Sequence, residues 1–162
     1  MRTDALTRTL ENLFGELMHG ASGKGGFMLN VGDRGLLRSL ERLSATEASA
    51  PTRTGSSIAA HVAHVSYGLS LLNHWSQGDN PFADADWAAS WRKTAVTASE
   101  WEALRIHLRD EAAKWLVVLR TPREVADIEL SGMIGSIAHL AYHMGAIRQI
   151  NAVARGPAEG ER

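Results

Sequence analysis

Cysteine is absent from the 162 residues of this chain. Its absence excludes disulfide bonds, thiolate metal ligands and a cysteine nucleophile. Any metal site must therefore be built from histidine or carboxylate side chains, and seven histidines are present.

The chain also lacks an excess of charge of either sign and long hydrophobic runs. Its 17 Lys and Arg residues stand against 18 Asp and Glu residues, so no basic surplus is available for a phosphate backbone, and we do not expect a nucleic-acid partner. No stretch approaches the ~20 apolar residues of a membrane span, and residues 1–11 lack the apolar core of a signal peptide. We expect a cytoplasmic protein with no membrane segment.

Apolar residues recur at intervals of three and four along most of the chain, which is typical of amphipathic helices. The pattern predicts helices over about residues 6–18, 33–48, 57–78, 87–92, 97–121 and 130–153. Asp33 and either Ser56 or Ser57 are candidate N-caps, and Thr97 with Glu100 forms a predicted capping box. Because no run alternates with the period of a strand, we expect an all-α fold, a four-helix bundle with additional short helices.

The length and the 44% hydrophobic content are those of one domain. We place this single helical domain at residues 1–156 and a flexible C-terminal tail at 157–162, after the stop signal Gly156-Pro157. The many glycines between Gly20 and Gly35 indicate a loop or a broken helix.

His139 and His143 lie four residues apart in the most apolar predicted helix, so both rings project from one face, a turn apart. An isolated pair with this spacing is more often a pair of core histidines. A second pair, His61 and His64, lies on another apolar helix, and helical bundles build metal sites from facing helices. Periodicity does not decide which of the second pair would be the third ligand.

Three neutral imidazoles and a water would form an open site, in which a metal lowers the pKa of bound water toward ~7. A closed structural site would need a fourth protein ligand. We favour the open site, because a domain of this size should not need a metal to fold.

Two segments, Ser57-Ile-Ala-Ala-His-Val-Ala-His64 and His139-Leu-Ala-Tyr-His-Met-Gly-Ala-Ile147, resemble motifs of the DinB-like (YfiT-like) superfamily of helical metalloenzymes. The resemblance implies a metal triad of His64, His139 and His143, with His61 beside it. It further implies one divalent ion, nickel or zinc, and either a hydrolase or a transferase that uses a low-molecular-weight thiol and a small-molecule substrate. Despite its name, the superfamily does not imply DNA binding.

Two other interpretations stay open: a non-catalytic, stress-response bundle in which the metal is structural, and a bundle with no physiological metal. Gly145 could allow a neighbouring helix to approach closely, and Tyr142 and Arg148 are expected at a rim or surface more often than in a pocket. The five tryptophans are expected mainly in the core or an interface, although some could line a hydrophobic cleft above the metal. We expect a homodimer.

Overall fold

The structure, a computed structural model, describes residues 6–21, 25–53 and 55–158. Within these ranges the chain forms helices and no strand, which confirms the predicted all-α class. The elements, in chain order, are α1 (Thr7–His19), α2 (Gly35–Glu41), α3 (Ala45–Ala48), α4 (Ile58–Ser76), α5 (Trp87–Ser90), α6 (Ala98–Arg120), α7 (Asp127–Ile150) and the 3-10 helix η1 (Ala152–Ala154).

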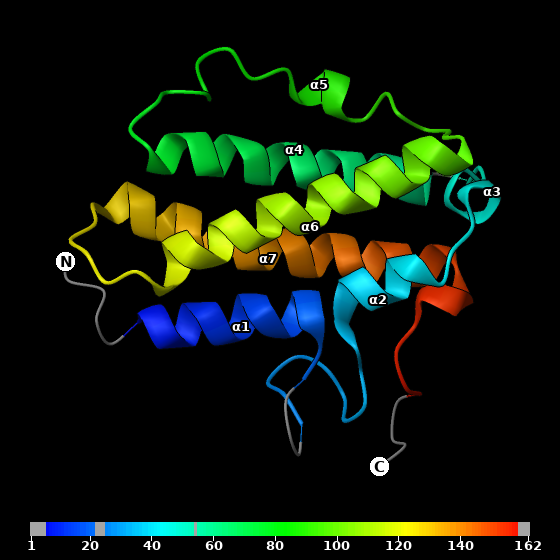
Figure 1. The fold of residues 1–162 in the computed structure, drawn as a ribbon, viewed down its shortest axis with the longest axis horizontal. Helices are drawn as coiled ribbons and strands as arrows, with labels where there is room; N and C mark the ends of the chain where they lie inside the picture. Colours follow the sequence, from blue (N-terminus) through cyan, green and yellow to red (C-terminus); the bar gives the residue numbers. More distant parts are fainter. Residues whose placement is uncertain (1–5, 22–24, 54, 159–162) are drawn as a thin grey trace.

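The four long helices, α1, α4, α6 and α7, pack lengthwise against one another (Figure 1). Helices α1 and α4 each contact both α6 and α7, so the four surround a common apolar core. Each helix contributes a side chain that is almost completely buried in it: Phe14, Val62, Trp115 and Ile147. Burial of this apolar surface is the main force that holds the helices together.

Local capping sets the start of α4 and of α6. The Ser57 hydroxyl accepts a hydrogen bond from the Ala60 N–H and starts α4, and Thr97 forms the predicted capping box with Glu100 at the start of α6. Each cap satisfies N–H groups that the first helical turn leaves without a partner.

The single helix predicted over 33–48 is wrong, because α2 ends at Glu41 and α3 begins at Ala45. Ser44 breaks the run: it adopts an extended backbone and forms its own capping box with Glu47. Helix α7 also ends at Ile150, before the predicted Val153, because Asn151 is extended and its side chain caps η1.

The glycine-rich segment includes a point where two backbones meet. Gly20 and Gly35 both have positive φ angles, 98° and 76°, and a Cβ on Gly35 would lie 2.4 Å from the Gly20 nitrogen. Only glycine fits this contact between the end of α1 and the start of α2. Residues 22–24 of the segment, residues 1–5 of the predicted domain and residues 159–162 of the predicted tail lie outside the described residues.

Candidate metal centre

Helices α4 and α7 bring together the three histidines that the resemblance implies. The Nε2 atom of His139 lies 3.1 Å from His64 Nε2 and 2.9 Å from His143 Nε2. Two nitrogens bound to one tetrahedral zinc ion at the usual bond length are about 3.3 Å apart. One ligand nitrogen from each ring lies within 4.8 Å of the other two, so the cluster could hold a metal ion.

A short hydrogen-bonded chain fixes the tautomer of His64. The Ser90 hydroxyl donates to the Trp87 carbonyl at 2.6 Å, so its oxygen is left to accept a hydrogen bond from His64 Nδ1 at 2.7 Å. A neutral imidazole carries one proton, and here Nδ1 carries it. The His64 Nε2 lone pair is therefore free and points at His139.

His61 makes the corresponding contact on the far side of His143. Its Nδ1 lies 2.9 Å from His143 Nδ1, and one of the two atoms must donate. When His143 donates, its Nε2 is also unprotonated. The His139 nitrogen then faces two lone pairs and can supply a proton to only one of them, whereas a cation would satisfy all three.

The surroundings keep these histidines neutral. Burial lowers the pKa of His64 to about 4 and that of His143 to about 3, and in both cases the nearby histidines add to the effect. Burial also lowers the pKa of His61 and of His139. Neutral imidazole is the form that binds metals, so protons compete weakly for these nitrogens at neutral pH.

Aromatic rings flank the cluster, two from the connection between α4 and α6 and one from α7. Trp91 stacks on His64 with ring centroids 4.2 Å apart, and Trp87 lies 5.7 Å from the same ring. Tyr142 contacts His143 edge to face at 5.0 Å. Two of the five tryptophans therefore form a wall of the site, the alternative to a core or interface position.

A cavity of about 430 Å³ lies near the cluster: His61 and Trp91, which contact the cluster histidines, line it, and the three proposed ligands do not. Its lining carries hydroxyl, amide and aromatic groups and no charged side chain: Thr52, Gly55, Ser56, His61, Trp91, Tyr142, Ala146, Gln149 and Ile150. The cavity is within the size range of small-molecule sites, and its lining suits a largely uncharged ligand.

The other residues weighed from the sequence lie elsewhere. In the described part of the chain, His19, His74 and His107 are not members of the metal-ligand cluster. Arg148 is not a rim residue, because it is mostly buried in an ion pair with Asp33. No neighbouring helix approaches closely at Gly145, because a Cβ there would have no neighbour within 4 Å.

No motif in the sequence pointed to Ser90, the residue that fixes the His64 tautomer. It lies 26 residues further along the chain, after an irregular connection, so no helical spacing relates the two. The helix predicted over 87–92 placed Ser90 on a short helix, which Asp86 caps by accepting from the Ala89 N–H, but it did not relate Ser90 to His64.

Comparisons with protein-family models, curated proteins and solved structures found no match. No helix in the described ranges has both the length and the apolar character needed to span a bilayer.

Proposed function

We propose that His64, His139 and His143 bind one divalent metal ion, nickel or zinc, through their Nε2 atoms, and that the protein is a metal-dependent enzyme. The convergence of the three Nε2 atoms, with the proton of His64 held on the opposite nitrogen by Ser90, carries the proposal. A cluster of core histidines needs no such convergence, because each ring would donate to a carbonyl.

The ligand set favours catalysis over a structural role. Three neutral imidazoles leave the charge of the ion uncompensated and leave a position for a water or a thiol, whose pKa the ion would lower. Within the described residues, no cysteine or carboxylate belongs to the cluster as a fourth ligand.

The residues around the ligands have separable roles in this proposal. Ser90 and His61 orient His64 and His143 through their Nδ1 atoms, as outer partners do in metal sites. Trp91 and Tyr142 line the open cavity in which a small-molecule substrate would bind.

For the reaction we propose hydrolysis or transfer involving a low-molecular-weight thiol, as in DinB-like proteins. Three features support membership of that superfamily: Ser57 caps α4, His64 follows it by seven residues, and the HxxxH pair lies in the last long helix.

Metal content tests the ligand assignment. We expect about one equivalent of divalent metal in the purified wild type and near-complete loss in His139→Ala. His74→Ala removes an exposed histidine from α4 and serves as the matched control, which should keep its metal. Absence of metal from wild type grown with added nickel and zinc, or its retention by His139→Ala, would contradict the assignment.

The cobalt-substituted protein separates an open site from a closed one. We expect a low-molecular-weight thiol to produce a sulfur-to-cobalt charge-transfer band, because the thiolate can reach the open position. A cobalt spectrum that no thiol, azide or change of pH alters would indicate a closed, structural ion.

A further inference from the structure

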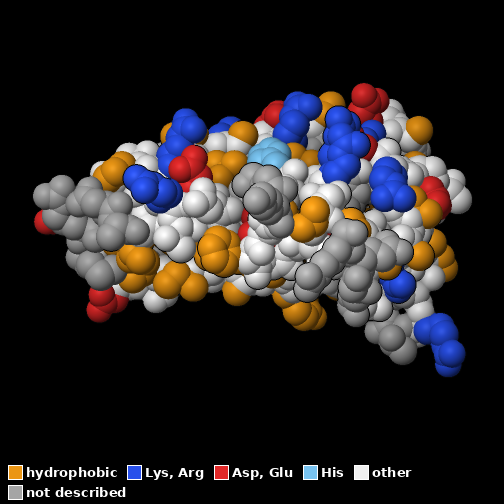
Figure 2. Space-filling model, turned by 90° about the horizontal axis from the view of Figure 1, so that it is seen from below, with side chains coloured by type: hydrophobic (Ala, Val, Ile, Leu, Met, Phe, Trp, Pro, Cys, Tyr) orange, Lys and Arg blue, Asp and Glu red, His pale blue; other side chains and the backbone are white. Residues whose placement is uncertain are grey.

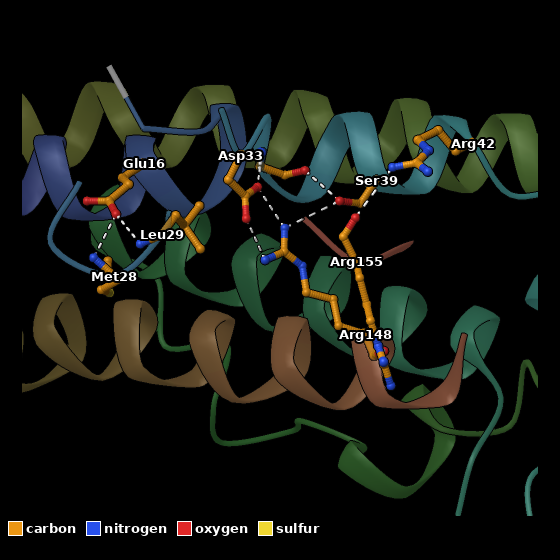
Figure 3. Close-up of polar contacts among 9 residues, drawn as sticks. Glu16, Met28, Leu29, Asp33, Ser39, Arg42, Arg148 and Arg155 are labelled. Carbon is orange, nitrogen blue, oxygen red and sulfur yellow. Dashed lines mark hydrogen bonds and ion pairs between the residues drawn. The ribbon is translucent and has the colours of Figure 1, made fainter. Parts of the chain in front are cut away.

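A second polar centre lies at the other side of α7, where α2 meets the end of the chain. Arg148 donates from Nη1 and Nη2 to the two carboxylate oxygens of Asp33 at 2.7 and 2.8 Å (Figure 3). Asp33 is 4% exposed and also accepts the Gly35 N–H at 2.9 Å. Arg148 is thus neutralised and held in place.

A cavity of about 600 Å³ opens beside this ion pair, and arginines line it. Arg34, Arg38 and Arg42 recur at every fourth residue from the N-cap to the C-cap of α2, so they share one face of the helix. Arg155 lines the same cavity from the segment that follows η1. Figure 2 shows the face of the molecule seen from below in Figure 1. Basic side chains gather there over the half that contains α2 and the end of the chain.

The acidic groups in the lining neutralise one of these arginines, Arg38, and leave the others unpaired. Asp33 is engaged by Arg148, and Glu41 pairs with Arg38. Among the described residues, Arg34, Arg42 and Arg155 form no ion pair. Arg34 and Arg42 therefore leave two uncompensated guanidinium groups beside one concave surface that Arg155 also lines, and this excess of positive charge favours an anion there.

Backbone carbonyls pre-position two of these arginines. Arg155 Nε donates to the Arg148 carbonyl at 2.9 Å, and Arg42 Nη1 donates to the Arg155 carbonyl at 3.4 Å (Figure 3). Neither contact consumes the remaining Nη donors of Arg155, whose planar fork matches the geometry of an oxyanion.

We propose that this cavity binds a small polyanion whose charge lies on phosphate groups or on closely spaced carboxylates. The volume fits a small molecule. No residue of the cavity belongs to the histidine cluster, so the site is separate from the candidate metal centre and does not depend on the proposed function.

Calorimetric titration of the full chain at low ionic strength, with pyrophosphate and with citrate as probes, tests the proposal. We expect binding of at least one probe and a roughly 10-fold weaker affinity in Arg42→Gln and in Arg155→Gln, the loss of one charge-assisted hydrogen bond. Arg120→Gln, at the exposed end of α6, is the charge-matched control and should change the affinity less than twofold. Tighter binding of pyrophosphate identifies phosphate groups as the natural chemistry, and tighter binding of citrate identifies carboxylates.

His139→Ala separates this site from an anion held by a metal, and it should bind the probe as wild type does. Loss of binding in that variant, no binding of either probe to wild type, or equal losses in Arg42→Gln and Arg120→Gln would overturn the proposal. Circular dichroism checks each fold. If Arg155→Gln does not fold, Arg42→Gln decides alone, because its exposed side chain makes one long contact to a carbonyl.

Discussion

Helix α7 contributes to two polar centres, and the two differ in whether their polar atoms find partners within the protein. Around Asp33 and Arg148, charges of opposite sign meet and both carboxylate oxygens accept hydrogen bonds. Around His139, three nitrogens converge with too few protons to join them. The first centre, complete in charge although Arg148 Nε has no hydrogen-bond partner among the described residues, should matter for stability, whereas the second is incomplete and should matter for binding.

The largest expected effect is on the complete centre. Asp33→Ala leaves the Arg148 guanidinium mostly buried without its counter-charge, so we expect the free energy of unfolding to fall by about 3 kcal/mol. Urea denaturation measures it, with Asp84→Ala at an exposed position as the control. A loss below about 1 kcal/mol would place the pair with ordinary surface ion pairs.

Metal addition should stabilise the protein through the incomplete centre. At a free zinc or nickel concentration 100 times the dissociation constant, we expect the free energy of unfolding to rise by about 2.7 kcal/mol. The same urea series, with and without metal, measures the change. Asp33→Ala should show a similar increment because its histidines are intact, and His139→Ala should show almost none. Equal increments in all three proteins would point to metal bound elsewhere.

Ser90→Ala should weaken metal binding without removing a ligand. Without the hydroxyl, His64 can place its proton on Nε2, so we expect about a 10-fold weaker affinity, at the low end for outer partners of metal sites. Competition with a chromophoric chelator measures the affinity, and Ser131→Ala on the exposed face of α7 is the matched control. An unchanged affinity would mean that Ser90 does not set the tautomer.

The smallest effect is the pH dependence of the complete centre. Burial alone would raise the pKa of Asp33, but hydrogen bonds from Arg148 and Gly35, with the charge of Arg148, outweigh it and lower the pKa below 3.8. The contribution of the carboxylate is therefore fully present above pH 3.8 and is lost as the pH falls through the lowered, folded value. The stability difference between wild type and Asp33→Asn should stay constant from pH 7 to about 5 and shrink only in stronger acid. A difference that already shrinks between pH 7 and 5 would contradict a lowered pKa.

The sequence predicted what local spacing and capping determine. The HxxxH pair, Ser57 as a candidate cap of α4 and the capping box of α6 all depend on neighbours within a few residues. The choice of His64 rather than His61 as the third metal ligand depended on the resemblance, because both residues lie on the buried side of α4.

The missed features join residues far apart in the chain. Asp33 was expected to be a helix cap, but Arg148, 115 residues away, engages its carboxylate, and Arg34 occupies the cap position. A distant partner of this kind leaves no periodic trace in the sequence. For the same reason the spacing did not show that His61 would contact His143 through the nitrogen opposite the proposed metal ligand.

The contact between His64 and Ser90 has a thermodynamic consequence for the connection between α4 and α6. Ser90 belongs to α5, which packs on α4 through this contact and through the neighbouring tryptophans. If α5 must be docked for His64 to keep its tautomer, metal binding and the opening of α5 are linked. Bound metal disfavours the opening of α5, and opening of α5 weakens metal binding by the same factor. Amide hydrogen exchange in residues 87–91 should then slow when metal binds. Exchange on this short helix would thus report whether the metal is bound, although α5 supplies no metal ligand.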